Sequence, residues 1–204
     1  KQKTAYEISL GLVGSEMCIR DSFQRAAVRS EDKVIIDKLD AATGVQELYA
    51  RGSSVDDITA DDKMTWELVL DAKKMIKEKG YDTSPGRIVL LLHPKQWADL
   101  MKDLGAELLG AADRQFVEQG EVLRLFGIDI VACDELPSAD NAGGVTVYRA
   151  FMFIKEESVA LAIARNLLIE IERDSKARAF VITGSHRIGA EVVVPNSVVK
   201  IYTA

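Results

Sequence analysis

The chain has 204 residues, of which 48% are hydrophobic and 28% are charged, and its formal net charge at pH 7 is −6. This composition is typical of a globular protein with one good core or two small ones. No apolar run approaches the roughly 20 residues that a membrane-spanning helix needs, so we expect no membrane partner. The acidic balance argues against a surface for nucleic acid phosphates, because such surfaces cluster lysine and arginine.

Residues that bear chemistry are few and scattered. Cys18 and Cys133 are too far apart in sequence to predict a disulfide framework or a zinc site. The sequence has no P-loop and no G-x-G-x-x-G, G-x-S-x-G or H-E-x-x-H motif. His93 has no ligand or base partner at a suitable spacing, and a capping or packing role beside Pro94 is favoured. We therefore expect no catalytic residue, no cofactor and no metal.

Residues 1–22 differ in character from the rest of the chain. The chain begins at Lys1 without a methionine, and this segment resembles a translated adapter sequence from assembled environmental DNA. We expect residues 1–22 to be a foreign segment, and the fold is predicted from Phe23 onward.

Two helices are predicted next. Apolar residues recur at helical spacing from Phe23 to Leu39, which predicts a long helix over residues 23–42, and residues 46–57 are expected to form a connecting loop. Thr59 and Asp62 form a variant capping box, which predicts a second helix over residues 60–79 that ends at Gly80.

A buried strand and a short helix come after these helices. The run from Ile88 to Leu92 is continuously apolar, as in a strand covered on both faces. Pro94 suits the first position of the helix over residues 94–104. Residues 105–119 are less periodic and are expected to form a loop with a short helix.

The remaining chain is rich in predicted strands. Alternating or continuous apolar runs between turn residues indicate strands over residues 123–131, 145–154, 167–173, 180–183, 190–194 and 198–202. Glycines on either side of the first of these strands predict a β-hairpin there. Residues 137–144 are expected to form an exposed loop. Residues 156–165 are expected to form a helix.

The order of these elements resembles a known family. A long helix, a capped helix, a buried strand with its LLHPKQWADL turn and the segment GEVLRLFGIDIV at residues 120–131 succeed one another. Arg187, Gly189 and the valine-rich run 192–194 before Pro195 then close the chain. This succession resembles the C-terminal portion of tailed-phage major capsid proteins of the Hong Kong 97 fold, over about residues 23–203.

The resemblance implies an α+β fold with a spine helix, a peripheral domain and an axial domain. On it, residues 23–58 are assigned to the spine helix and linker of the peripheral domain, 59–165 to an axial-like region and 166–204 to returning strands. The family's N-terminal arm and extended loop would be missing if residues 1–22 are foreign, and no crosslinking residues can be assigned.

The function implied by the resemblance is structural. Such a subunit self-assembles through hexamers and pentamers into an icosahedral virion shell, in the host cytoplasm. The shell encloses DNA without sequence-specific binding, and an acidic chain would not trap a genome electrostatically. Encapsulin-type compartments share the architecture but enclose cargo proteins, so they remain an alternative.

Five charged residues are predicted to make contacts between subunits. Arg25, Arg29 and Lys33 lie on the polar side of the first helix, and Glu170 and Glu172 share one face of a strand. The two glutamates lie about 7 Å apart on that face. A second hypothesis is that this pair forms the carboxylates of a hydrolase.

Overall fold

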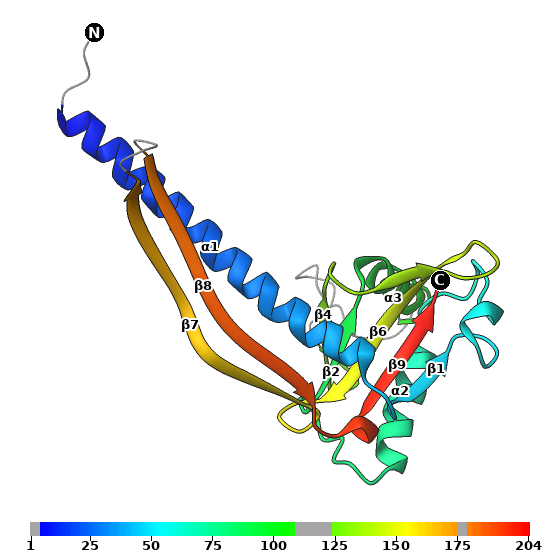
Figure 1. Cartoon of the computed structure of the whole chain (residues 1–204). Coiled ribbons are helices and arrows are strands. Elements are labelled where there is room, and N and C mark those ends of the chain that lie inside the picture. The colour runs from blue at the N-terminus through cyan, green and yellow to red at the C-terminus, as the bar shows by residue number, and fades with distance from the viewer. Residues whose placement is uncertain (1–4, 109–123, 175–178) are drawn as a thin grey trace. The chain divides into compact units, whose positions relative to one another are not determined.

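A computed structural model of the chain describes residues 5–108, 124–174 and 179–204. The described residues divide into two compact units. Unit 1 comprises the described residues among 1–35 and 161–190, and unit 2 comprises those among 36–160 and 191–204. The helices and strands, labelled as in Figure 1, are α1 (Ala5–Ala41), β1 (Gln46–Tyr49), α2 (Trp66–Glu78), β2 (Ile88–Leu92), α3 (Pro94–Leu108), β3 (Arg124–Leu125), β4 (Ile128–Ala132), β5 (Ser138–Asp140), β6 (Thr146–Ile154), β7 (Val159–Asp174), β8 (Ala179–Val192) and β9 (Val198–Thr203).

Unit 1 consists of most of α1 and a two-stranded sheet of β7 and β8. Figure 1 shows these strands as two long arrows that run in opposite directions. At about 3.3 Å per residue the 16 residues of β7 extend roughly 50 Å, which is unusually long for a strand. An isolated two-stranded sheet is marginally stable, so α1 is needed to cover one of its faces.

The helix α1 ends as predicted but begins earlier. Residues 5–22 continue the same helix in the structure. Their suggested origin as a foreign segment stays a prediction, because the conformation of a segment does not reveal where its sequence came from. No helix among the described residues is long and apolar enough to cross a membrane.

Unit 2 is built on a seven-stranded sheet in the order β1-β9-β6-β2-β4-β3, with β5 paired to β6. The pairs β1/β9 and β2/β4 are parallel, and the others are antiparallel. Alternate residues of the central strands point to one face, where α2 and α3 cover them. The core on this face contains Val69, Ala72 and Ile76 of α2, Leu100 of α3 and the strand residues Ile88, Leu90, Ile128, Ile130, Met152, Ile154, Val199 and Ile201.

The opposite face of this sheet is also covered. Phe151 of β6 and Lys200 of β9 are cross-strand partners on this face, and both are buried. Ile36 and Leu39, near the end of α1, are buried in the same unit. The prediction that residues 88–92 form a strand covered on both faces is therefore confirmed.

Helix α2 begins later than predicted. Thr59 donates from its backbone N–H and its Oγ1 to Asp62, both at 2.7 Å, so the predicted capping contact forms. It closes an isolated turn, however, because the chain then passes through the buried Met64 before the helix starts. The N-cap of α2 is Thr65, whose side chain accepts a bond from Leu68 N–H.

The predicted helix over residues 156–165 is wrong. Glu156 adopts φ 65°, and the chain turns there into β7. The segment's alanines favour a helix locally, but pairing with β8 overrides that preference. The strands predicted over residues 180–183 and 190–194 are joined in one continuous strand, β8, which ends at Val192.

Three smaller predictions also differ from the structure. The loop expected over residues 46–57 contains the edge strand β1, and the loop over 137–144 contains β5. The strand expected over residues 123–131 is broken by a two-residue turn at Phe126 and Gly127, which confirms the hairpin signal. Residues 109–119 of the predicted loop with a short helix lie outside the described residues, and α3 extends to Leu108.

The unit boundaries are determined by strand pairing. They fall after residues 35, 160 and 190, whereas the predicted domain boundaries fall after residues 22, 58 and 165. Within the described ranges, strands β7 and β8 pair only with each other, while β9 returns to the larger sheet between β1 and β6. The assignment of the predicted segments to peripheral and axial domains stays a prediction.

Candidate assembly surface

The three predicted basic contact residues form a row on α1. Arg25, Arg29 and Lys33 are four residues apart, so they lie on one side of the helix, and all three are exposed. Among the described residues no ion pair joins any of them to an acidic partner within the chain. The row is therefore available to a partner outside the chain.

The other side of α1 faces strand β8. Phe23, Ala27 and Glu31 repeat every four residues there and are partly buried. The ring of Phe23 lies directly over the α-carbon of Gly184, and Glu31 Oε1 lies 3.1 Å from His186 Nε2. These contacts fix α1 against the sheet of unit 1 and leave the basic row turned away from β8.

The two predicted acidic residues lie on β7. Leu167 and Ile169 are partly buried, whereas Glu170 and Glu172 are exposed, as the predicted alternation requires. The alternation stops at Ile171, which is 46% exposed. Neither glutamate lines the hollow around Asp61 and Glu67 or the hollow around Asp99 and Asp103, and both are open to solvent. An open strand face gives a carboxylate pair no shielding from water, so this geometry does not favour the hydrolase hypothesis.

Unit 1 also exposes large apolar side chains. They project from α1 and from both strands, and each is at least 40% exposed: Val28, Leu161, Ile163, Leu168, Ile171 and Val181. Leu161 and Ile163 are two residues apart on β7, so they share one face of the strand, and neighbouring exposed apolar side chains are common where one protein contacts another. The combination of apolar side chains with a basic row and an acidic strand face suits association between copies.

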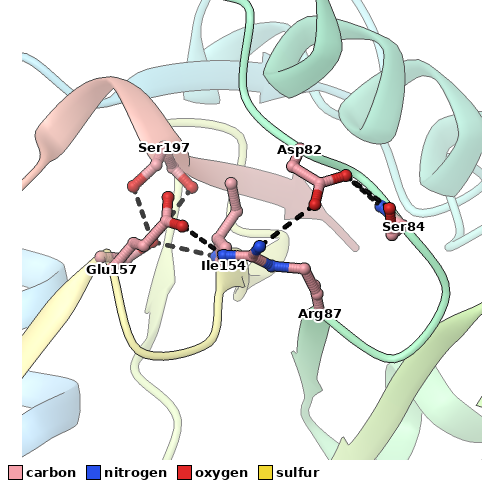
Figure 2. Close-up of polar contacts among 7 residues, drawn as sticks. Asp82, Ser84, Arg87, Ile154, Glu157 and Ser197 are labelled. Atoms are coloured by element: carbon pink, nitrogen blue, oxygen red, sulfur yellow. Dashed lines mark hydrogen bonds and ion pairs between the residues drawn. The ribbon is translucent and has the colours of Figure 1, made fainter.

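A polar network secures the chain in unit 2 just before β7. Figure 2 shows the Arg87 guanidinium between the carboxylates of Asp82 and Glu157. The Arg87 Nη1 to Asp82 distance is 3.1 Å, and Ser84 donates to Asp82 from its backbone N–H and its hydroxyl. These bonds, led by that of the Ser84 hydroxyl, lower the pKa of Asp82 below its ordinary value.

Two buried serines complete this network. The hydroxyls of Ser158 and Ser197 lie 2.6 Å apart, and both residues are fully buried. Ser158 Oγ accepts from Ile154 N–H, and Ser197 Oγ donates to the carbonyl of Val194. The network ties the end of β6 to the segment before β9, so the start of β7 is held firmly within unit 2.

A second group of polar residues holds the C-terminal end of α1. Arg149 Nη1 lies 2.7 Å from both carboxylate oxygens of Asp40. Lys200 Nζ donates to the carbonyls of Asp40 and Ala42, at 2.7 and 3.1 Å. Neither polar group was predicted from the sequence, where the only available signal was a single lysine inside the apolar run from Val198 to Tyr202.

His93 has the capping role that the sequence predicted. Its Nδ1 accepts from Lys95 N–H at 3.2 Å, and its ring lies 4.5 Å from that of Tyr148. Burial lowers the pKa of His93 below its ordinary value. Among the described residues no group of three histidine, cysteine, aspartate or glutamate side chains could hold a metal ion.

Comparisons with known proteins agree with this architecture. A structure from Mycobacterium phage Che8 is 19% identical over 87% of this chain, with a TM-score of 0.64. The capsid of Cyanophage P-SCSP1u is 14% identical over the whole chain, with a TM-score of 0.59 and 67% of its own length covered. The SrpI encapsulin of Synechococcus elongatus PCC 7942 is 12% identical, with a TM-score of 0.61, over 90% of this chain and 63% of the encapsulin.

These three structures are less than 25% identical to the chain, so they show only its fold. A family model shows the sequence family. The chain spans 60% of the length of the Che8 protein. No match was found among curated protein sequences. The family model described as "Phage capsid protein" matches residues 17–204. The chain therefore belongs to the phage capsid protein family and has the Hong Kong 97 fold.

Proposed function

We propose that the chain is a structural subunit of a tailed-phage capsid, rather than an enzyme, and that copies of it assemble through hexamers and pentamers into the icosahedral virion shell. The observation that carries this proposal is the family match over residues 17–204, together with the fold. We further propose that assembly takes place in the host cytoplasm and that the shell encloses DNA. The net charge of −6 suits such a container, because like charge disfavours contacts with phosphates.

The direct test is to express the 204-residue chain and examine it by mass photometry and negative-stain electron microscopy. We expect rings of five or six copies, or closed shells. A monomer that persists at millimolar concentration would contradict the proposal, because the chain carries the exposed apolar and charged surfaces of unit 1.

An encapsulin-type compartment is the second candidate, supported by the TM-score of 0.61 with the SrpI encapsulin. The contents of the assembled particle separate the two functions. Particles purified from cells that carry the native gene neighbourhood would hold nucleic acid in the first case and a cargo protein in the second. Portal and terminase genes nearby would also favour the phage capsid.

Within the proposed shell, we assign Arg25, Arg29 and Lys33 of one subunit to contacts with Glu170 and Glu172 of a neighbour. Both groups are exposed, and their charges are complementary. Exposed ion pairs are individually weak, but each contact is repeated around a ring of subunits.

Charge reversal tests this assignment. We expect Arg29→Glu to weaken association about fivefold per contact, since a contact of about 1 kcal/mol corresponds to that factor. Adding Glu170→Arg should restore association in the double variant, as measured by sedimentation velocity at low salt. Lys79→Glu makes the same charge change on an exposed lysine of unit 2 and should leave association unchanged. Equal effects of Arg29→Glu and Lys79→Glu would show that only net charge matters.

A further inference from the structure

Strand β7 leaves one long edge of its sheet unpaired. Among the described residues it pairs only with β8, and Figure 1 shows β8 between β7 and α1. The sheet of unit 2 ends instead in short strands, β1 with four residues and β3 with two. Short edge strands are a common protection against pairing with other chains, and the 16-residue strand β7 lacks this protection.

The sequence of β7 also lacks the residues that usually protect an edge. It contains no proline, glycine or lysine. Its partner β8 contains Gly184 and Gly189, and glycine weakens a strand. Three apolar side chains on one face of β7 are exposed, those of Leu161, Ile163 and Ile171. The outer edge of β7 therefore has the features of an edge that accepts another strand.

The side chains of β7 match a second copy of β7 in one antiparallel register. In the register centred on Asn166, residues equally far from Asn166 in the two copies lie opposite each other. Leu161 then lies opposite Ile171, and Ile163 lies opposite Ile169. Each of these apolar pairs occurs twice, so every exposed apolar residue on this face meets an apolar partner. Cross-strand pairs of this kind stabilise a sheet.

The same register keeps like charges apart. Glu170 and Glu172 lie opposite alanines of the other copy. Moving the centre to residue 165 would place Arg165 opposite itself, and moving it to residue 167 would place Leu161 opposite Arg173. Like charges directly opposite each other destabilise a sheet. The register centred on Asn166 is therefore favoured over its two neighbours.

We propose that β7 pairs edge to edge with β7 of a second copy, antiparallel and centred on Asn166. Pairing joins two marginal two-stranded sheets into one sheet of four strands, which is the size at which a sheet becomes stable. The contact is two-fold symmetric, so the sequence of one strand contains both sides of it. The inference does not rest on the proposed shell, since an isolated pair of copies satisfies it.

Cysteine crosslinking of the full chain tests the register. Asn166→Cys places two sulfurs on residues directly opposite each other, whose α-carbons lie about 4.5 to 5.5 Å apart, within reach of a disulfide. Ala164→Cys is the matched control on the same face, because its two copies lie roughly 13 Å apart along the strands. We expect the disulfide-linked dimer to form at least about tenfold faster with Asn166→Cys. Peptide mass spectrometry locates the bond, so the native cysteines can stay.

A mixture of two variants gives the control its own positive result. Ala164 lies opposite Leu168 in the proposed register, so chains with Ala164→Cys should crosslink to chains with Leu168→Cys faster than either crosslinks to itself. Thermal unfolding shows whether each variant is folded. Equal rates for Asn166→Cys and Ala164→Cys, or a folded Asn166→Cys chain that forms no disulfide, would overturn the proposal. Shells that assemble without this disulfide would leave the proposed function intact.

Charges placed at Leu161 and Ile171 test the same register independently. Both side chains are exposed, so these substitutions leave the core unchanged. In an Asn166→Cys chain, lysine at both positions opposes like charges at both ends of the contact, and glutamate at both positions does the same. Each double substitution should slow crosslinking about tenfold, and an equimolar mixture of the two chains should restore it as a mixed dimer. A mixture that crosslinks as slowly as either chain alone would show that β7 does not pair in this register.

Discussion

Replacing Lys200 with methionine is expected to lower the free energy of unfolding of unit 2 by about 2 to 4 kcal/mol, because two partly buried carbonyls would lose the charged donor that is itself buried beside them. Lys200 is 5% exposed, and its ammonium group bonds to the carbonyls of Asp40 and Ala42. The last carbonyls of a helix have no partner within the helix, and a cation near them also interacts favourably with the helix dipole. Methionine preserves most of the volume of lysine but supplies neither donor nor charge.

Urea denaturation followed by tryptophan fluorescence measures the unfolding of unit 2, where Lys200 lies. The two tryptophans, Trp66 and Trp97, both lie in unit 2. Lys200→Arg retains the charge and donors and should cost clearly less. Lys38→Met removes an exposed lysine that pairs with Glu191 and should cost less than about 1 kcal/mol. A Lys200→Met protein as stable as the unmodified chain would show that water replaces the ammonium group at the end of α1.

The partners of Lys200 also show what the sequence could not reveal. The lysine and its acceptors are about 160 residues apart, and nothing in local periodicity relates them. Buried polar contacts of this kind depend on which strand lies beside which helix end. The same limit explains the error at residues 156–165, where an alanine-rich segment with helical character pairs as a strand with β8.

Elements whose signal is local were predicted well. The run from Ile88 to Leu92, the proline that begins α3 and the turn at Phe126 and Gly127 each carry their own physical reason. The contact between Thr59 and Asp62 was also predicted correctly, although it closes a turn instead of starting a helix. The fold family was predicted from the order of these elements, which remains informative when single boundaries are wrong.

The candidate contact residues were predicted only in part. Alternation and helical spacing correctly indicated that Arg29 and Glu170 are exposed and on which side of their elements they lie. The residues that they contact belong to another copy in the proposed shell, and a single sequence contains no pattern that pairs two surfaces. Their assignment therefore depends on the charge-reversal experiment.

Gly184→Val is expected to destabilise the packing of α1 on β8 by about 1 to 3 kcal/mol, by overpacking. A β-carbon at residue 184 would lie 2.6 Å from Phe23 Cδ1 and 2.8 Å from Cε1, well inside van der Waals contact. This effect opposes the usual trend, in which replacing a strand glycine with a β-branched residue is favourable. The sign of the measured change therefore decides whether the ring of Phe23 rests on this glycine.

The control for Gly184→Val lies in the same strand. A β-carbon at Gly189 would meet nothing within 4 Å, so Gly189→Val should be neutral or slightly stabilising. Phe23→Ala removes the ring and should cancel most of the cost of Gly184→Val, which gives a coupling free energy of about 1 to 2 kcal/mol in a double-mutant cycle. Hydrogen exchange of α1 and β8 reports on unit 1 directly, while tryptophan fluorescence should show unit 2 unchanged. If both glycine variants behave alike, or if Phe23→Ala gives no rescue, the close approach of α1 to β8 at Gly184 does not limit the stability of unit 1.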